Sequence, residues 1–343
     1  MIIEIIEGCG NSEIKEYLNS NDKTIFFSDP NYINLVSNHL KCKPYWIVAK
    51  KDNSIQSVLP FMIKDGKCGK VFNSLPYFGS NGGVIQNMNN TKLKAKMIST
   101  YYDYFNYRKG ISATIITSPF EKDIETYESQ IKYDFKDYRI GQITYLDRLN
   151  DYDDLINSYQ NPRPRNIRKA IKEGVTIEQS QSDEAIEILF NIHYENINSI
   201  SGRTKKKSFF TKIPKYINRD QWTIYQAKKE DKVIANLLVF YCNKTVEYFT
   251  PGTIADYRSI QPLALIIYKA MQDAVSKKML YWNWGGSSPT QLGIYDYKRK
   301  WGTIDHNYYY YTAINGINLI NKKKDFILKE YEGFYCLPFN ALR

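Results

Sequence analysis

The sequence predicts an α/β protein with mixed sheets (α+β in organisation), built from two domains of the same kind. The chain has 343 residues, more than a single hydrophobic core usually supports, so two domains are expected. Strand-like runs alternate with amphipathic helical segments in both halves. One short hairpin-like pattern also occurs twice, once in each half. Together these features favour a duplicated unit with a mixed sheet.

The repeated pattern is a pair of strands joined by a lysine-rich turn. Residues 49–55 read Ala-Lys-Lys-Asp-Asn-Ser-Ile, and residues 227–233 read Ala-Lys-Lys-Glu-Asp-Lys-Val. Each copy follows an aromatic-rich strand that includes Trp46 or Trp222 and precedes a second apolar run. Chance similarity of two lysine-rich turns is the alternative for so short a match. Duplication predicts a first domain of residues 1–147 and a second of residues 148–343, with the last helix able to pack back on the first domain.

In the first half, alternating and β-branched runs predict strands and amphipathic runs predict helices. The expected strands are 2–6, 45–50, 55–63, 112–117 and 142–146, and the expected helices are 31–40 and 92–107. The first helix follows Ser28-Asp29-Pro30, a sequence typical of a helix N-terminus.

In the second half the predicted order is three strands, a helix and a strand. Pro262 starts the clearest helix, 262–277, whose apolar residues recur at helical spacing, and strands are expected at 245–250 and 279–284. Another helix is expected at 183–200. His193 lies on its apolar face, which favours a core or cleft-edge histidine over a ligand.

Composition and charge narrow the classes of partner. Apolar residues make up 43% and charged residues 24%, an ordinary globular balance. The formal net charge of +11 favours anionic partners, namely phosphorylated substrates, tRNA or an acidic membrane surface. The five cysteines include no C-x-x-C pair, and there are only three histidines, so neither a metal site nor a disulfide framework is expected.

The expected location is the cytoplasm, with peripheral contact at the inner face of the membrane as an option. The N-terminus, Met-Ile-Ile-Glu-Ile-Ile, lacks the basic segment and long apolar core of a secretory signal. The sequence also contains no apolar run of transmembrane length.

Residues 281–302 combine an apolar strand, a glycine-rich loop and a cationic cluster. The strand ends on Gly285 and Gly286, which predicts a sharp turn. Asp296 then stands beside Lys298, Arg299 and Lys300 in one helix-like turn before Trp301 and Gly302. A solvated loop followed by a solvated helix face is an equally good interpretation of the pattern alone.

The same stretch resembles the C-terminal signature of the Fem-like branch of GNAT-fold acyltransferases. The matching residues are Gly285, Gly286, Ser287, Ser288, Pro289, Gly293, Tyr297, Lys298, Trp301 and Gly302. Two further segments are similar to this family in the same order, Leu75-Pro76-Tyr77 with Gly82-Gly83, and residues 161–175. The resemblance implies two tandem GNAT-like domains with a cleft between them and an amide-forming acyl transfer.

It also implies roles for particular residues. Lys298 would stabilise the oxyanion of the tetrahedral intermediate, and Asp296 is the local carboxylate that could assist. Substrate contacts are expected from Tyr77, Tyr248, Gly285 and Ser287. Four arginines are predicted to form one anion-binding wall for a phosphorylated acceptor: Arg163, Arg165, Arg168 and Arg203. The alternative is that these arginines pair with surface carboxylates such as Asp151, Asp153, Asp154 and Glu173.

The acyl donor is the most open point. Classical GNAT enzymes bind coenzyme A with a glycine-rich loop, but residues 257–264 here read Tyr-Arg-Ser-Ile-Gln-Pro-Leu-Ala, without glycine. Arg258 and Gln261 could still hold a phosphate at the start of the next helix. Acyl-CoA is therefore the expected co-substrate, with no permanently bound cofactor. Aminoacyl-tRNA, the donor of Fem peptidyltransferases, is the alternative.

Three functions follow. The first is a cytoplasmic N-acyltransferase acting on a nucleotide-linked amino sugar in envelope polysaccharide biosynthesis. The second is an aminoacyl-tRNA-dependent transferase acting on a peptidoglycan precursor. The third is a non-catalytic GNAT-like protein that binds nucleic acid or an anionic surface.

Overall fold

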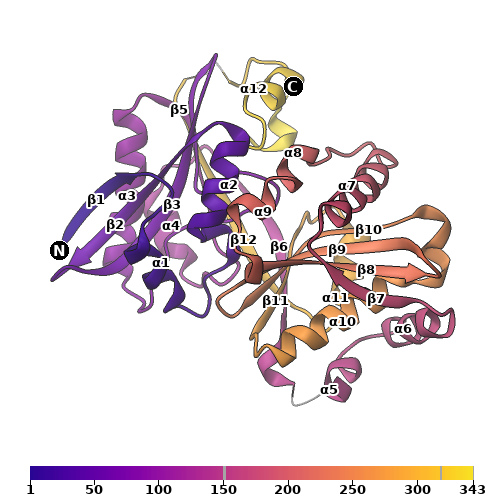
Figure 1. Ribbon diagram of the computed structural model, residues 1–343. Coiled ribbons are helices and arrows are strands. Elements are labelled where there is room, and N and C mark those ends of the chain that lie inside the picture. The colour runs from indigo at the N-terminus through magenta and orange to yellow at the C-terminus, as the bar shows by residue number, and fades with distance from the viewer. Residues whose placement is uncertain (150–151, 317–318, 343) are drawn as a thin grey trace. The chain divides into compact units, whose positions relative to one another are not determined.

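The computed structural model describes residues 1–149, 152–316 and 319–342 (Figure 1). The chain forms two compact units. The first unit combines residues 1–139 with residues 307–343, and the second contains residues 140–306. The C-terminal segment thus belongs to the same unit as the N-terminus.

The first unit is a sheet covered by helices. Its strands are β1 (Ile2–Glu7), β2 (Lys43–Lys51), β3 (Ser54–Gly66), β4 (Gly69–Asn73), β5 (Gly110–Ile116) and most of β12 (Ile304–Ile314). Its helices are α1 (Ser12–Asn19), α2 (Pro30–Leu40), α3 (Thr91–Tyr107), α4 (Ile124–Gln130) and α12 (Lys324–Glu330), with short 3₁₀ turns η1 (Phe26–Ser28) and η5 (Phe339–Ala341). The predicted start of α2 is confirmed, because Asp29 accepts the backbone N–H of Asn31 ahead of Pro30.

The second unit is also a sheet with helices packed on it. Its strands are β6 (Phe135–Tyr145), which starts in the first unit, β7 (Thr176–Ser180), β8 (Trp222–Lys229), β9 (Lys232–Cys242), β10 (Thr245–Thr253) and β11 (Tyr281–Ser287). Its helices are α5 (Tyr152–Asn157), α6 (Arg163–Lys172), α7 (Asp183–Asn198), α8 (Lys207–Phe210), α9 (Ile213–Tyr216), α10 (Pro262–Ser276) and α11 (Leu292–Arg299), with η2 (Leu146–Arg148), η3 (Arg219–Gln221) and η4 (Ala255–Ile260).

The two units share one strand order. In the first unit, neighbouring strands follow the order β1-β2-β3-β4-β5-β12, and in the second they follow β7-β8-β9-β10-β11-β6. In both units the fourth and fifth strands are parallel and are joined through a long helix, α3 or α10, whereas the other neighbours are antiparallel. The prediction of a mixed α/β fold is confirmed, and the common order supports duplication.

The repeated hairpins match in detail. Lys51 pairs with Ser54 across the two-residue loop of the first hairpin, and Lys229 pairs with Lys232 across that of the second. The register then shifts immediately after Ala49 in one hairpin and after Ala227 in the other. A bulge at the same place in two hairpins is a feature that chance similarity of two turns does not explain.

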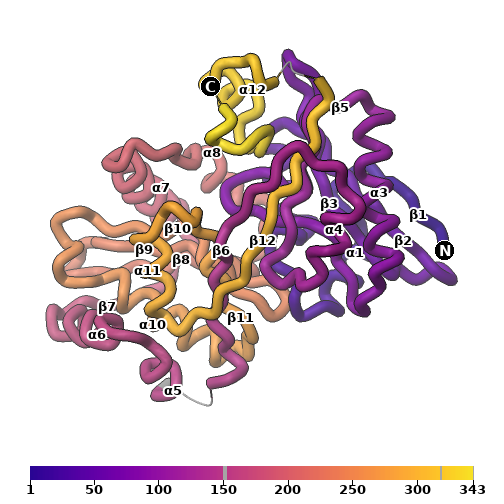
Figure 2. The backbone as a smooth tube through the Cα atoms, turned by 180° about the vertical axis from the view of Figure 1, so that it is seen from behind, coloured from indigo at the N-terminus to yellow at the C-terminus, as the bar shows by residue number. Residues whose placement is uncertain are grey.

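The last strand of each sheet comes from the other half of the sequence. β12 pairs with β5 in the first unit, and β6 pairs with β11 in the second (Figure 2). β6 follows the first repeat along the chain but completes the sheet of the second repeat. β12 follows the second repeat but completes the sheet of the first. Each repeat therefore contributes its last strand to the sheet of the other repeat.

Helices cover both faces of the sheet in the second unit (Figure 1). One face packs against α10 and α6, whose apolar residues join those of β8, β9 and β10 in a single core. The opposite face packs against α7. His193 is buried on α7, where its Nε2 accepts the backbone N–H of Lys205 at 3.1 Å, and burial lowers its pKa to about 3. This is the predicted core histidine.

Several elements differ from the sequence prediction. The strand expected to stop before Gly285 continues to Ser287, because the turn expected there is instead an irregularity inside the strand. The strands β4, β7 and β12 and the helices α1 and α4 were not predicted. In the described part of the chain, no helix has both the length and the apolar character needed to cross a membrane.

Candidate functional site

A bulge in β11 brings two backbone carbonyls to the side chain of Lys298. The register of β11 with β6 shifts between Asn283 and Gly286, and Gly285 adopts φ +68°, a left-handed conformation that favours glycine. The side chain of Asn283 accepts the N–H of Gly285 at 2.9 Å, which fixes this turn of the strand. The carbonyl oxygens of Gly285 and Gly286 then accept from Lys298 Nζ at 3.4 and 3.2 Å.

Lys298 is a buried cation without a carboxylate within ion-pair distance among the described residues. It is 7% exposed, and burial lowers its pKa to about 8. At neutral pH most molecules still carry the ammonium, and it lies in a medium of low dielectric constant where its field is strong. Such a group can stabilise negative charge that develops on an adjacent oxygen.

Arg163 holds the peptide that precedes Lys298. Its guanidinium carbon lies 4.0 Å from the centroid of the Tyr297 ring and 5.4 Å from that of Trp301. Its Nη2 donates to the backbone oxygen of Tyr297 at 2.9 Å. A flat guanidinium can stack on rings and donate in its own plane at once, which suits arginine better than lysine at this place.

Tyr248 joins this group from β10. Its ring lies 4.8 Å from that of Trp284, and the phenol of Tyr297 is close enough to affect its pKa. Burial raises the pKa of Tyr248 well above its ordinary value. Burial also raises the pKa of Tyr297, although the nearby charge of Arg163 acts in the opposite direction. Both phenols therefore remain protonated at neutral pH and can donate hydrogen bonds.

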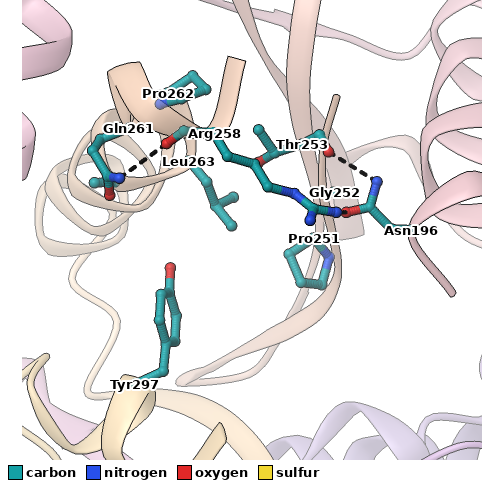
Figure 3. Close-up of a pocket in the computed structure, with 10 residues that line it drawn as sticks. Asn196, Pro251, Gly252, Thr253, Arg258, Gln261, Pro262, Leu263 and Tyr297 are labelled. Carbon is teal, nitrogen blue, oxygen red and sulfur yellow. Dashed lines mark hydrogen bonds between the residues drawn. The ribbon is translucent and has the colours of Figure 1, made fainter. Parts of the chain in front are cut away.

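A pocket of about 320 Å³ opens at the N-terminus of α10 (Figure 3). Tyr297 points its hydroxyl toward the space between Leu263 and Pro251. The pocket is lined by Asn196, Pro251, Gly252, Thr253, Arg258, Gln261, Pro262, Leu263, Ala264 and Tyr297. Tyr297 is the residue of α11 that lines the pocket, and Lys298 follows it in the chain without lining the pocket itself.

The polar rim of this pocket is held by hydrogen bonds. Arg258 donates to Asn196 at 3.2 Å, and Asn196 donates to the Thr253 carbonyl at 2.9 Å. Gln261 donates to the carbonyl of Arg258 at 2.9 Å and accepts from Asn166 of α6 at 2.9 Å. Arg258 and Gln261 thus lie at the pocket rim, and the phosphate contact expected of them stays a prediction.

The first turn of α10 offers few free backbone donors. Pro262 has no N–H, and the N–H of Ala264 donates to the carbonyl of Gln261 at 3.1 Å. Gln261 itself has φ +62°. The helix dipole still favours an anion here, but fewer backbone N–H groups are available to bind a phosphate.

Asp296 faces other cations of its own helix. It accepts from Arg299 at 2.8 Å and from Lys300 at 2.5 Å, and these contacts lower its pKa. A carboxylate with a lowered pKa is a weak base, so this position suits an ion-pair role better than proton abstraction.

The four arginines of the predicted anion-binding wall do not share one surface. Arg163 is buried against Tyr297, whereas Arg165 and Arg168 are exposed on α6, and Arg203 is exposed after α7, which covers the other face of the sheet. Among the carboxylates considered as partners, Glu173 pairs with Lys229 at 3.3 Å, and Asp151 lies outside the described residues.

Two other predicted contacts are buried. The Ser287 hydroxyl donates to Gln142 of β6 at 3.4 Å. Tyr77 belongs to the first unit, where its backbone N–H donates to Gly333 at 2.7 Å and its ring packs on His39. Neither observation assigns a substrate contact, and both assignments stay predictions.

Sequence reasoning did not identify Asn196, Asn166 or Asn283 as site residues. Each is an asparagine whose side chain orients backbone or another side chain at the site. Asn283 stands two residues before Gly285, and that spacing is a usable signal for a side chain that caps a turn. Asn166 and Asn196 carry no comparable local signal. Within the described chain, no group of three or more His, Cys, Asp or Glu residues is arranged to hold a metal.

The strand order, the parallel fourth and fifth strands and the pocket at the connecting helix define a tandem GNAT-type fold. Three solved structures resemble the chain across most of its length. FemX has a TM-score of 0.73 at 14% identity, covering 90% of this chain and 97% of FemX. A tandem GNAT protein from the clavulanic acid biosynthesis pathway has a TM-score of 0.53 at 9% identity, with coverage of 92% and 99%. The C-terminal domain of a putative lysylphosphatidylglycerol synthetase from Agrobacterium fabrum has 0.55 at 10%, with coverage of 95% and 98%.

Residues 192–307 match the model of the FemAB family. The predicted resemblance to the Fem-like branch of GNAT-fold acyltransferases is thereby confirmed. No curated protein matches the sequence. These similarities support a transferase of acyl or aminoacyl groups.

Proposed function

We propose that this chain transfers an acyl group from an activated donor to the amine of a nucleotide-linked amino sugar or a related envelope polysaccharide precursor. The observation that carries the proposal is the buried Lys298 ammonium, held at the Gly285 and Gly286 carbonyls beside a pocket that Tyr297 lines. Attack of a neutral amine on an activated carbonyl places negative charge on the carbonyl oxygen, and a preorganised cation stabilises that charge.

The donor is proposed to enter the pocket at α10. Arg258 supplies a positive charge at the rim and the helix N-terminus a favourable dipole, which suits the phosphates of acyl-CoA. A second donor, aminoacyl-tRNA, is favoured by one specific observation. The first turn of α10 begins with Pro262 and bonds the Ala264 N–H internally, so little of a pyrophosphate cradle is left.

Replacing Arg258 by alanine tests the donor site. Loss of one charge-assisted contact at an exposed position is expected to weaken coenzyme A binding about tenfold, as measured by calorimetry. Arg219→Ala, an arginine of η3 outside the lining of the pocket, is the matched control and should bind like the unchanged protein.

The donor classes separate in a transfer assay read by mass spectrometry. The protein is incubated with amino-sugar nucleotides and either acetyl-CoA or bulk aminoacyl-tRNA. If the protein transfers from aminoacyl-tRNA and does not bind coenzyme A, then aminoacyl-tRNA is the donor. No transfer from either donor to an amino-sugar nucleotide or a peptidoglycan precursor contradicts the transferase proposal and leaves a GNAT-like binding protein.

The acceptor phosphates are proposed to contact Arg165 and Arg168. Both are exposed on α6, which is tied to the pocket rim by the Asn166–Gln261 hydrogen bond. Arg203, the residue that family resemblance favours, is the competing candidate on the other face of the sheet.

Calorimetry with a uridine- or thymidine-diphosphate sugar compares the α6 arginines with Arg203 as acceptor contacts. Arg165→Ala is expected to weaken binding by about tenfold or more, because a charge-assisted contact contributes roughly 1.5–3 kcal/mol. Arg203→Ala should leave the affinity unchanged. If Arg203→Ala weakens binding and Arg165→Ala does not, the acceptor binds on the face of the sheet that α7 covers. If neither variant changes the affinity, neither arginine contacts the acceptor.

A further inference from the structure

Arg163 is a buried guanidinium whose pKa is affected more strongly by burial than by the carboxylate of Asp296. It is 7% exposed, and in the described part of the chain no carboxylate lies within ion-pair distance of it. Its Nε is buried and has no hydrogen-bond partner among the described residues. Taking a charge out of water without a counter-ion is costly, and an apolar side chain would fill the same space without that cost. Space-filling therefore does not account for an arginine at this position.

The contacts of Arg163 converge on one peptide. Nη2 donates to the Tyr297 carbonyl at 2.9 Å, and the guanidinium plane covers the Tyr297 ring at 4.0 Å. Tyr297 is in the last turn of α11, where exposed helix carbonyls favour a cation. The carbon of that carbonyl is bonded to the backbone nitrogen of Lys298. Arg163 thus restrains the backbone from which the Lys298 side chain starts.

The far end of Lys298 requires that restraint. Its Nζ reaches the carbonyls of Gly285 and Gly286 at 3.4 and 3.2 Å, distances that a small rotation of α11 would lengthen beyond hydrogen bonding. The helix is short, Leu292–Arg299, and its first turn carries the exposed side chains of Leu292 and Ile294. The C-terminal end of α11 is held by the Arg163 contact, and nearer its start the Tyr295 carbonyl accepts from Gln142 Nε2 of β6 at 3.2 Å.

We propose that Arg163 is a positioning residue, which acts through the carbonyl and ring of Tyr297 to hold the Lys298 ammonium at the Gly285 and Gly286 carbonyls. The role of that ammonium in transfer rests on the proposed function, but its position does not. Arginine is required because the same side chain must stack on a ring and donate to a carbonyl, and lysine cannot do both.

The test measures Lys298 without any substrate. The full-length protein is labelled with trace acetic anhydride from about pH 6 to about pH 11, and the acetylation of the Lys298 peptide is followed by mass spectrometry. The unchanged protein should show a midpoint near the pKa of about 8 that burial imposes on Lys298. In Arg163→Met and Arg163→Lys, we expect the midpoint to move up toward the ordinary value of 10.5 as Lys298 leaves the carbonyls for solvent.

Arg163→Lys distinguishes a positioning role from two simpler explanations, which are the loss of a nearby positive charge and the failure of the variant to fold. It keeps a buried cation, so a shift in this variant cannot come from loss of a nearby positive charge, and it is the variant most compatible with folding. Lys172→Met, an exposed change on the same helix, is the matched control and should keep the midpoint near 8. A folded Arg163→Lys protein with an unshifted midpoint overturns the proposal, since a purely structural arginine lowers stability without moving that value.

The outcome is independent of the proposed chemistry. A protein that transfers no acyl group still reports the position of Lys298 by labelling, so failure of the transferase proposal leaves this result intact. Where transfer is observed, Arg163→Lys should lower kcat by about tenfold or more with little change in KM, the pattern of a lost transition-state interaction. An unchanged kcat counts against the proposal.

Discussion

Lys298→Met is expected to lower the rate of transfer by about 10²–10³-fold while the protein stays folded. The reason is that loss of a preorganised donor at a developing oxyanion typically has an effect of this size. In the unchanged protein the rate should fall as the pH rises through about 8, where Lys298 loses its proton. Single-turnover kinetics with the donor identified above measures both. A Lys298→Met enzyme with an unchanged kcat and the same pH profile contradicts the oxyanion role.

The same substitution should make the protein more stable. Burial lowers the pKa of Lys298 from 10.5 to about 8, so the folded state binds this proton less tightly than the unfolded chain does. The resulting destabilisation is complete below pH 8 and disappears as the pH rises from 8 to 10.5. At neutral pH it corresponds to about 3 kcal/mol. Part of this gain in the free energy of unfolding is offset, because the Gly285 and Gly286 carbonyls lose their hydrogen-bond donor in Lys298→Met.

Urea unfolding at neutral and at alkaline pH measures this effect. Lys298→Met should exceed the unchanged protein in free energy of unfolding at pH 7, and the difference should narrow as the pH approaches 10.5. Lys269→Met, an exposed change on α10, should stay within about 0.5 kcal/mol of the unchanged protein at both pH values. A Lys298→Met protein less stable than the unchanged one at neutral pH would show that the carbonyl contacts outweigh the cost of burial.

Trp301→Ala is expected to lower the free energy of unfolding by about 3–5 kcal/mol, because it leaves a large cavity in a packed core. Trp301 is fully buried, with ring centroids 4.9 Å from Tyr159 and 5.7 Å from Trp284. Its backbone N–H donates to the Lys298 carbonyl at 3.0 Å, so the damage reaches the site as well. Guanidinium unfolding followed by circular dichroism measures the loss.

Trp301→Phe is the matched control. It keeps an aromatic ring against Tyr159 and leaves a smaller cavity, so the loss should be less than half as large. If both substitutions cost less than about 1 kcal/mol, the tryptophan is not part of a close-packed core, and its place in the signature needs another explanation.

The sequence by itself determined the local structure wherever a pattern repeated or a cap was present. Pro262 and the helical spacing of apolar residues predicted α10, and Asp29-Pro30 predicted the start of α2. The hairpins at 49–55 and 227–233 predicted two related units. Tyr297-Lys298 and Trp301-Gly302 located the candidate site. These signals involve residues close together in the chain, so their physical causes can be recognised without a fold.

Only the tertiary structure decided which strands complete each sheet and where the site's side chains point. β6 and β12 exchange between the repeats, which depends on pairing between segments far apart in the sequence. Gly285 and Gly286 form a bulge within β11 rather than a turn, because β6 pairs with the strand on both sides of them. Arg163 and Arg165 differ by two positions, yet one is buried on Tyr297 and the other is exposed, because residues two apart on a helix face different directions. Which of those directions meets α11 is set by packing between distant elements, and the sequence does not record it.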